Sequence, residues 1–383
     1  GGRANDQVGI GRVTALTNGN YVVGSPFWAN PSLGGSNSAG AATWGNGTTG
    51  TVGSITATNS LIGGGSDNNV GSGVTALTNG NYVVRSPFWD NSSPFVQDVG
   101  AVTWCDGTGV TVGVVTASNS LIGSRPFDNA GTTGVTALTN GNYVVASRLW
   151  DNPSPVIADV GAVTWCSGTT GCTGPVTASN SLIGGTQNDR VGGTGITALS
   201  DGSYVVKSTG WDNPSPLIAD VGAATYCSAA SPCTGLVTAS NSLIGGTATD
   251  WVGNGVTALN DGNYVVSSPI WDNPSPMLQD AGAATFCSST TPCSGLVTAS
   301  NSLVGSTAFE QVGNFGVTAL TNGNYVIATP QWDNPSPVRM EAGAATFCTA
   351  AAPCTGPINS TNSLTGGRAN DQVGIGRVTA LTN

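Results

Sequence analysis

Two kinds of residue recur at fixed spacing along this sequence and are suited to chemistry: tryptophan followed by an acid, and paired cysteines. An indole ring offers an apolar face for a sugar ring, and neighbouring Asp and Asn side chains can bond its hydroxyl groups. The pairs are Trp89-Asp90, Trp150-Asp151, Trp211-Asp212, Trp271-Asp272 and Trp332-Asp333. These residues are therefore candidates for a glycan-binding face. The competing interpretation packs each Trp between repeats, with each Asp capping a turn.

Carboxylates in pairs can also hydrolyse glycosidic bonds. Here, however, the acids return at equivalent positions in repeat after repeat, whereas a catalytic pair is needed only once. The chain has no His and a single Lys, Lys207, which argues against Ser-His-Asp and Cys-His nucleophiles and against most zinc catalysis. It also has no phosphate-binding glycine loop of the P-loop type. We expect no enzymatic activity, no cofactor and no metal site.

Eight of the nine cysteines form pairs separated by five residues. The pairs are Cys166/Cys172, Cys227/Cys233, Cys287/Cys293 and Cys348/Cys354. Each first Cys ends a predicted strand and each second Cys precedes the next one, so both sulfurs can meet across a loop. Zinc would require other spacings and usually His. We predict local disulfides and hence an oxidising, extracellular or cell-surface location.

Cys105 has no partner at this spacing. We expect a free, buried thiol, and the alternative is a cross-link between chains.

All these residues belong to a repeat of about 61 residues. "VTALTNGNYVV" begins at Val13, and related copies begin at Val74, Val135, Ile196, Val256 and Val317, with a truncated copy at Val378. We divide the chain into residues 1–12 (a linker or strand from a preceding repeat), repeats 13–73, 74–134, 135–195, 196–255, 256–316 and 317–377, and the start of a seventh, 378–383. Together they are expected to form one domain over residues 1–383.

One repeat, 256–316, illustrates the strands expected in all of them. "VTALNDGNYVVSSPIW" is a β-hairpin around Asp261-Gly262, for which we expect a type I′ turn. "WDNPSP" is a loop, "AGAATFC" (281–287) a third strand, and "LVTASNSLVGS" (296–306) a fourth. The recurrent Asn of "NSL" is expected to close a turn, and the Tyr that begins each second strand to pack between repeats.

Four antiparallel strands in each repeat are typical of a β-propeller blade. The sequence therefore predicts an all-β repeat protein, a six-bladed β-propeller of four-stranded blades. The alternative is a stacked β-solenoid, in which each repeat covers two or three coils.

The stretches "DQVGIGRVTALTNGNYVVGSPFW" and "GAATWGNGTTG" resemble the FG-GAP blades of integrin-like propellers, once per repeat over essentially the whole chain. The chain resembles still more closely an uncharacterised repeat of about 61 residues in very large secreted bacterial proteins, which often also carry filamentous-haemagglutinin-type secretion modules. It departs from FG-GAP in two ways. The acidic calcium loop is missing, and Val replaces Phe at Val8, Val70, Val191, Val252, Val312 and Val373. The resemblance therefore implies a blade but neither calcium nor an integrin-like ligand.

Residues 1–18 and 366–383 are identical, although neighbouring repeats differ at many positions. The duplication indicates either a window cut from a longer periodic protein or a strand that completes a neighbouring unit. The alternative to self-association is an isolated ring with one extra, unpaired strand. We expect head-to-tail self-association through these segments, because unpaired edges recruit strands and contacts that do not close generate filaments.

The net charge of the chain argues against some classes of partner. The formal net charge is −10, with ten Lys and Arg against twenty Asp and Glu. This balance argues against nucleic acid and against docking on anionic lipid, and no apolar run is long enough for membrane insertion. We predict a structural or adhesive element of a bacterial surface filament or stalk, an adhesin-like role. The alternative is a lectin-like propeller that binds glycans.

Overall fold

The computed structural model describes residues 1–3, 5–34 and 37–381. These residues are almost entirely strands and turns, and the one helical element among them is a 3-10 turn, η1 (Pro31–Leu33). The chain divides into two compact units, the first formed by residues 1–193 and 232–236 and the second by 194–231 and 237–383. The all-β repeat class predicted from the sequence is confirmed.

Every repeat opens with an antiparallel hairpin, because Val, Tyr and Thr favour extended backbone on both sides of a Gly turn. The first strands are β1 (Val13–Ala15), β5 (Gly73–Ala76), β12 (Gly134–Ala137), β19 (Gly195–Ala198), β26 (Gly255–Ala258) and β33 (Val317–Ala319). The second strands are β2 (Tyr21–Ser25), β6 (Tyr82–Ser86), β13 (Tyr143–Ser147), β20 (Tyr204–Ser208), β27 (Tyr264–Ser268) and β34 (Tyr325–Thr329).

The turn of this hairpin differs from the predicted type I′. In repeat 1 the Gly19 N–H donates to the Leu16 carbonyl at 3.1 Å, and the Leu16 N–H donates to the Asn20 carbonyl at 2.8 Å. Of the central residues only Gly19 has a positive φ, of 87°. This is a type I turn followed by a glycine bulge, which requires one left-handed residue instead of two.

The third and fourth strands complete an antiparallel sheet on the other side of the second strand. The third strands are β3 (Ala41–Gly45), β9 (Ala101–Cys105), β16 (Ala162–Cys166), β23 (Ala223–Cys227), β30 (Ala283–Cys287) and β37 (Ala344–Cys348). The fourth strands are β4 (Leu61–Ile62), β11 (Leu121–Ile122), β18 (Ser181–Ile183), β25 (Ser242–Ile244), β32 (Leu303–Val304) and β39 (Leu364–Thr365).

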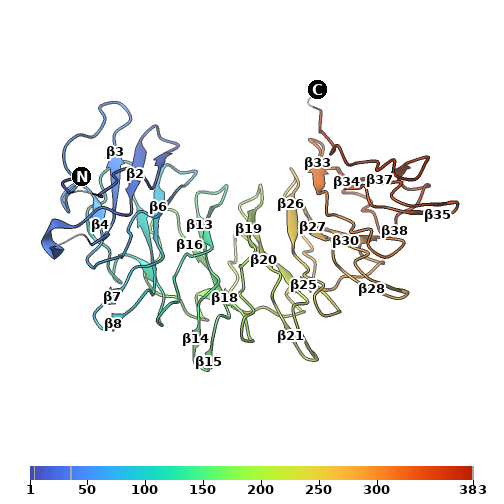
Figure 1. The fold of residues 1–383 in the computed structure, drawn as a ribbon, viewed down its shortest axis with the longest axis horizontal. Helices are drawn as coiled ribbons and strands as arrows, with labels where there is room; N and C mark the ends of the chain where they lie inside the picture. Colours follow the sequence, from blue (N-terminus) through green and yellow to red (C-terminus); the bar gives the residue numbers. More distant parts are fainter. Residues whose placement is uncertain (4, 35–36, 382–383) are drawn as a thin grey trace. The chain divides into compact units, whose positions relative to one another are not determined.

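A fifth strand comes from the following repeat and pairs in parallel with the fourth. These strands are β10 (Gly113–Val114), β17 (Gly174–Pro175), β24 (Gly235–Leu236), β31 (Gly295–Leu296) and β38 (Gly356–Pro357). The sheet of repeat 1 thus has the order β1-β2-β3-β4-β10, and its equivalents follow the same pattern up to the four-stranded sheet β33-β34-β37-β39. Within each unit, successive first strands are in contact, β1 with β5 and β5 with β12 in one, β19 with β26 and β26 with β33 in the other (Figure 1).

The predicted fourth strand, 296–306, is therefore two short strands with a turn between them. Asn301 makes this turn: its Oδ1 accepts the Thr298 N–H at 2.9 Å, and its Nδ2 donates to the Leu296 carbonyl at 2.9 Å. An Asn side chain that bonds nearby backbone competes with a continuous strand. The turn-closing role expected of this Asn is confirmed.

The Trp-Asp-Asn loop also contains regular structure that the sequence did not predict, a two-residue hairpin in five repeats. These hairpins are β7 (Asn91–Ser92) with β8 (Phe95–Val96), β14 (Asn152–Pro153) with β15 (Val156–Ile157), β21 (Asn213–Pro214) with β22 (Leu217–Ile218), β28 (Asn273–Pro274) with β29 (Met277–Leu278), and β35 (Asn334–Pro335) with β36 (Val338–Arg339). The apolar residue that follows the turn is exposed in each of them, from 63% for Val156 to 78% for Val338.

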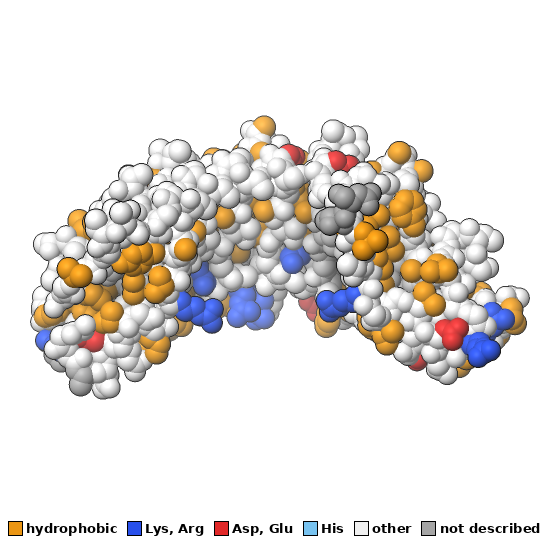
Figure 2. Space-filling view, turned by 90° about the horizontal axis from the view of Figure 1, so that it is seen from above, with side chains coloured by type: hydrophobic (Ala, Val, Ile, Leu, Met, Phe, Trp, Pro, Cys, Tyr) orange, Lys and Arg blue, Asp and Glu red, His pale blue; other side chains and the backbone are white. Residues whose placement is uncertain are grey.

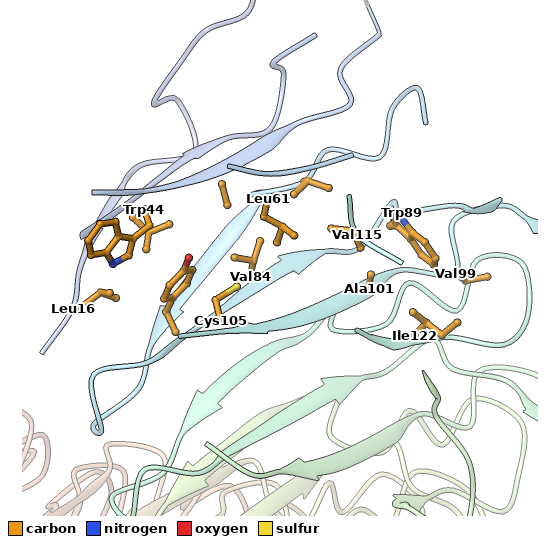
Figure 3. Close-up of a cluster of buried hydrophobic side chains, with 14 residues drawn as sticks. Leu16, Trp44, Leu61, Val84, Trp89, Val99, Ala101, Cys105, Val115 and Ile122 are labelled. Atoms are coloured by element: carbon orange, nitrogen blue, oxygen red, sulfur yellow. The ribbon is translucent and has the colours of Figure 1, made fainter. Parts of the chain in front are cut away.

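The apolar core lies between neighbouring sheets. One cluster combines Leu16 and Trp44 of repeat 1 with Val84, Trp89 and Cys105 of repeat 2 (Figure 3). In the second unit, another joins residues of repeats 4 and 5 in the same way. Tyr82, Tyr143, Tyr264 and Tyr325 of the second strands are buried in these clusters, so their predicted packing between repeats is confirmed. Tyr21 of repeat 1 is only half-buried.

The four antiparallel strands predicted for each repeat are present, whereas the parallel pairing into the next repeat was not predicted. Each repeat lends one two-residue strand to the sheet of the repeat before it, and the main sheets are otherwise separate, so the choice between propeller and solenoid stays open. Closure of six repeats into a ring stays a prediction.

Candidate functional site

The five loop tryptophans proposed as sugar platforms are buried where the second strand ends. Their exposed fractions lie between 0% for Trp150 and Trp332 and 3% for Trp89. Each indole belongs to the core between sheets, as Trp89, Trp150, Trp271 and Trp332 do in four separate clusters. Rings enclosed in this way offer no face for stacking on a sugar. The geometry matches the packing interpretation and does not support Trp89, Trp150, Trp211, Trp271 and Trp332 as a glycan platform.

The aspartates that follow these tryptophans stabilise their own loops by accepting backbone N–H groups. The Oδ1 atom of Asp90 accepts the backbone N–H of Asp98 at 2.7 Å, and Asp151 accepts that of Asp159 at 2.8 Å. The same contact recurs at Asp212, Asp272 and Asp333, with distances of 2.8, 2.8 and 2.6 Å. A carboxylate that accepts a backbone N–H group from its own loop holds that loop in one conformation. This is the turn-capping role that the sequence offered as the alternative to sugar binding.

A second set of acids, which sequence reasoning missed, lies beneath the turn that connects successive repeats. Oδ2 of Asp128 accepts the N–H groups of Ser124 (2.6 Å) and Arg125 (2.8 Å), and Oδ1 accepts the N–H of Asp151 (2.9 Å). The corresponding residues Asp6, Asp189, Asp250 and Glu310 are no more than 4% exposed, whereas Asp371, at the same position of the last copy, is exposed and accepts the Arg368 N–H at 2.8 Å. The available signal was an acid recurring two residues before the Val or Ala that precedes a Gly.

Burial determines how these acids titrate. It raises the pKa of Asp128 to about 6, against the opposing effect of the backbone N–H groups that favour the carboxylate. Burial likewise raises the pKa of Asp250 and of Glu310. Asp128, Asp250 and Glu310 therefore hold their protons more tightly in the folded chain than in the unfolded chain, whereas the pKa of Asp6 is lowered.

Repeat 1 breaks this pattern because Asn68, near its end, replaces the acid. Its Oδ1 accepts the Gly65 N–H at 2.8 Å. Its Nδ2 is buried and has no hydrogen-bond partner among the described residues.

Asn68 lines a cleft of about 650 Å³ together with Trp89 and Asp90, one of the predicted Trp-Asp pairs. The cleft is lined by residues 64–66, 68, 89–93, 95 and 114–118. Trp89 and Asp90 contribute to its wall, and the exposed ring of Phe95 stands at its rim with 70% of its surface accessible.

Three of the predicted disulfides, Cys166–Cys172, Cys287–Cys293 and Cys348–Cys354, join the end of a third strand to the following loop. Cys227 and Cys233 are disulfide-bonded as well. Closing so short a loop restricts the unfolded chain and contributes about 2 kcal/mol for each bridge. The predicted disulfide bonding is confirmed.

Cys105 is a free thiol and fully buried. Thr111 occupies the position of the second cysteine, and burial raises the pKa of the Cys105 thiol to about 12. A neutral, enclosed thiol is unreactive. The expectation of a buried free cysteine is confirmed, and the geometry gives no support to a cross-link between chains.

Among the residues that the structure describes, no cluster of three or more His, Cys, Asp or Glu side chains is arranged to hold a metal ion. In residues 1–3, 5–34 and 37–381 no helix has the length and apolarity needed to cross a bilayer. The disulfides are compatible with an extracellular protein.

Comparison with known families gives one match, and it recurs six times. The profile of a repeat of unknown function, DUF5650, matches residues 15–72, 76–132, 137–193, 198–254, 258–314 and 319–375. No curated protein sequence matches the chain. The matches support a tandem-repeat protein and lend no support to an FG-GAP or integrin-like identity. With six copies over most of its length, the chain belongs to the DUF5650 repeat family.

Proposed function

We propose that this chain is a non-enzymatic structural or adhesive element of an extracellular filament or stalk, extended by the same strand pairing that joins its repeats. The observation that carries the proposal is the parallel fifth strand. The Gly113 N–H donates to the Ser60 carbonyl at 3.1 Å, and the Val115 N–H donates to the Ile62 carbonyl at 3.0 Å. Each repeat thus completes the sheet of the one before it.

Further bonds reinforce this dependence of each repeat on its neighbour. Asn18 and Asn20 both donate through Nδ2 to the Gly107 carbonyl, at 2.9 and 3.0 Å. One repeat later, Asn79 and Asn81 both donate to Gly168 at 2.8 Å. Such nearest-neighbour coupling is the physical basis of long repeat arrays.

Complementary edges remain for a further repeat, whether in the same chain or in a second copy. In repeat 1 the equivalent donors are the N–H groups of Gly53 and Ile55, and in repeat 6 the equivalent acceptors are the carbonyls of Ser363 and Thr365. None of these four groups makes a hydrogen bond within the part of the chain that the structure describes. An open edge with matching partners favours strand addition.

The assembly can be tested by removing one donor. Ile55→Pro eliminates the N–H equivalent to that of Val115, and we expect it to shorten or abolish the fibres that electron micrographs of concentrated wild-type protein should show. The matched control is Ser54→Pro, because Pro175 and Pro357 occupy the same position in two paired strands. Wild-type protein that stays as single particles, or Ile55→Pro fibres as long as those of Ser54→Pro, would contradict the proposal.

A non-enzymatic role is consistent with how the recurring acids are used. The acids after each Trp and the acids beneath each inter-repeat turn are engaged with backbone N–H groups. Such repeated contacts hold loops in place. The disulfides suit a durable material in an oxidising environment.

The cleft of repeat 2 favours a second candidate function, glycan binding at one site. Arg125, near the end of repeat 2, is equivalent to Gly65 of repeat 1, and its side chain lies 3.5 Å from Asp151 of repeat 3. Gly65 has no side chain and leaves the space beside Asp90 open. Phe95 is the only aromatic residue among the exposed hairpin residues of the described repeats, and Ser92, Ser93 and Asn91 supply hydroxyl and amide groups.

Saturation-transfer NMR with glucose, galactose, mannose and N-acetylglucosamine tests this candidate. Phe95→Val, which introduces the residue of repeat 3, should reduce the transfer signal at least tenfold, because the ring that stacks on the sugar is lost. Val156→Ala, at the same exposed position of repeat 3, should leave the signal unchanged. Absence of transfer to all four sugars, or equal signals from both variants, would rule out this site.

A further inference from the structure

Arg85 carries a positive charge that is half-buried without an acidic partner. It lies on β6 opposite Gly73, and its guanidinium covers that glycine so closely that a Cβ there would lie 2.7 Å from Nη2. Its Nη1 donates to the Gly131 carbonyl at 3.0 Å. Burial lowers the pKa of this guanidinium, and no carboxylate pairs with it among the described residues. Buried charges in proteins are ordinarily paired.

A second arginine shares the same space. Arg12 and Arg85, from adjacent repeats, line a cleft of about 410 Å³ together with residues 10, 11, 14 and 72–74. No acid lines this cleft, and Arg12 makes no ion pair in the described chain. Two arginines that line one cleft with no acid in its lining repel each other, and an anion bound between them would offset that repulsion.

The backbone of Arg12 adds an independent observation. Its φ is 75°, in the left-handed region, and three equivalent residues of later repeats are glycines with positive φ: Gly134, Gly195 and Gly316. A side chain is unfavourable in this conformation. An arginine held where other repeats use glycine indicates that its side chain has a role.

The sparse charge of the molecule makes this pair conspicuous. The chain has only ten Lys and Arg and a net charge of −10. Figure 2 shows that most of the visible surface is uncharged, with Lys and Arg side chains (blue) in a few groups. In repeat 4, Lys207 stands at the position of Arg85, opposite Gly195, and burial lowers its pKa as well.

We propose that the cleft between repeats 1 and 2 binds an oxyanion, a sulfate, phosphate or carboxylate group, between Arg12 and Arg85. The planar fork of each guanidinium suits two parallel bonds to such a group. The Thr14 hydroxyl, which lines the cleft, is a further possible donor. The site is independent of the strand edges proposed for assembly.

Calorimetric titration at low ionic strength with sodium sulfate, sodium phosphate and sodium acetate tests the proposal. At least one of the three anions should bind. Arg12→Gly, the residue of the other internal repeats, and Arg85→Ala, the residue of repeat 3, should each weaken its affinity at least tenfold. Arg12→Gly should leave the melting temperature unchanged or higher, since glycine accepts the positive φ, so that lost binding is not mistaken for unfolding.

Arg148→Ala is the matched control, because Arg148 is exposed and does not line the cleft. It should bind the anions as the wild-type protein does. A parallel titration with dextran sulfate and neutral dextran shows whether a polymer can present the anion. No binding of any of the three salts, wild-type affinity in both cleft variants, or an equal loss in Arg148→Ala would overturn the proposal.

Discussion

Trp271→Ala is expected to lower the free energy of unfolding by about 3–5 kcal/mol. The indole is only 1% exposed and packs with Tyr264, Val266 and Cys287 in the core of the second unit. Truncation removes its apolar contacts and leaves a cavity that a β-sheet framework closes poorly. Urea denaturation followed by far-ultraviolet circular dichroism measures the loss.

Two variants make this result specific. Trp271→Phe retains much of the volume and should cost less than the alanine variant. Leu296→Ala changes a residue that is 50% exposed and should shift stability by less than about 0.5 kcal/mol. If Trp271→Ala were as stable as Leu296→Ala and lost only affinity for sugars, the packing role assigned to the loop tryptophans would be wrong.

Asp128→Ala is expected to cost about 3 kcal/mol or more, since three backbone N–H groups lose their acceptor in a buried setting. Asp128→Asn should cost less, because Asn68 occupies the same position in repeat 1 and still accepts the Gly65 N–H. The free energy of unfolding of both variants, measured at pH 7, tests this order. If both variants lost the same free energy of unfolding, the acceptor oxygen that Asn retains would contribute nothing to stability.

The raised pKa of Asp128 also fixes the sign of a pH dependence. The folded pKa is about 6 and the unfolded value is close to 3.8. The contribution of this protonated group to stability is therefore fully present below about pH 4 and is lost as pH rises through about 6. Relative to Asp128→Asn, the wild-type protein should be more stable at pH 4.5 than at pH 7.5. The opposite trend would show that the N–H groups outweigh burial.

The elements that could be predicted from the sequence are those with local signals. Alternating Val and Tyr around Asn18-Gly19 predicted the hairpin, the Cys-x5-Cys spacing predicted the disulfides, and the Asn of "NSL" predicted a closed turn. Each depends on residues close in the chain, so no knowledge of neighbouring repeats was needed.

The features that were missed depend on contacts between repeats. A two-residue strand such as β10 has no periodicity, and its pairing with β4 joins residues about fifty positions apart. The hairpin turn is a type I turn with a glycine bulge instead of the predicted type I′ turn, because this form needs only one residue with a positive φ. Burial decided the role of the tryptophans, because the pattern Trp-Asp-Asn suits both a sugar site and a capped, packed corner.

Comparison among repeats contains information that a single repeat does not. Gly65 stands where repeat 2 has Arg125, Phe95 where repeat 3 has Val156, and Arg12 where the internal copies have Gly73, Gly134, Gly195, Gly255 and Gly316. Each exception lines a cleft in the first unit. The residues that all repeats share form the common fold, and the exceptions are the positions at which repeats 1 and 2 differ from the other repeats.

The short hairpins of the Trp-Asp-Asn loops have a practical consequence. Each carries an outward residue, successively Phe95, Val156, Leu217, Met277 and Val338, whose identity changes while the Trp and Asp that fix the loop stay the same. The repeats thus already carry different outward residues on the same Trp-Asp loop. A designer can therefore graft chosen groups there, one per copy, and turn the chain into a multivalent display whose avidity is set by copy number.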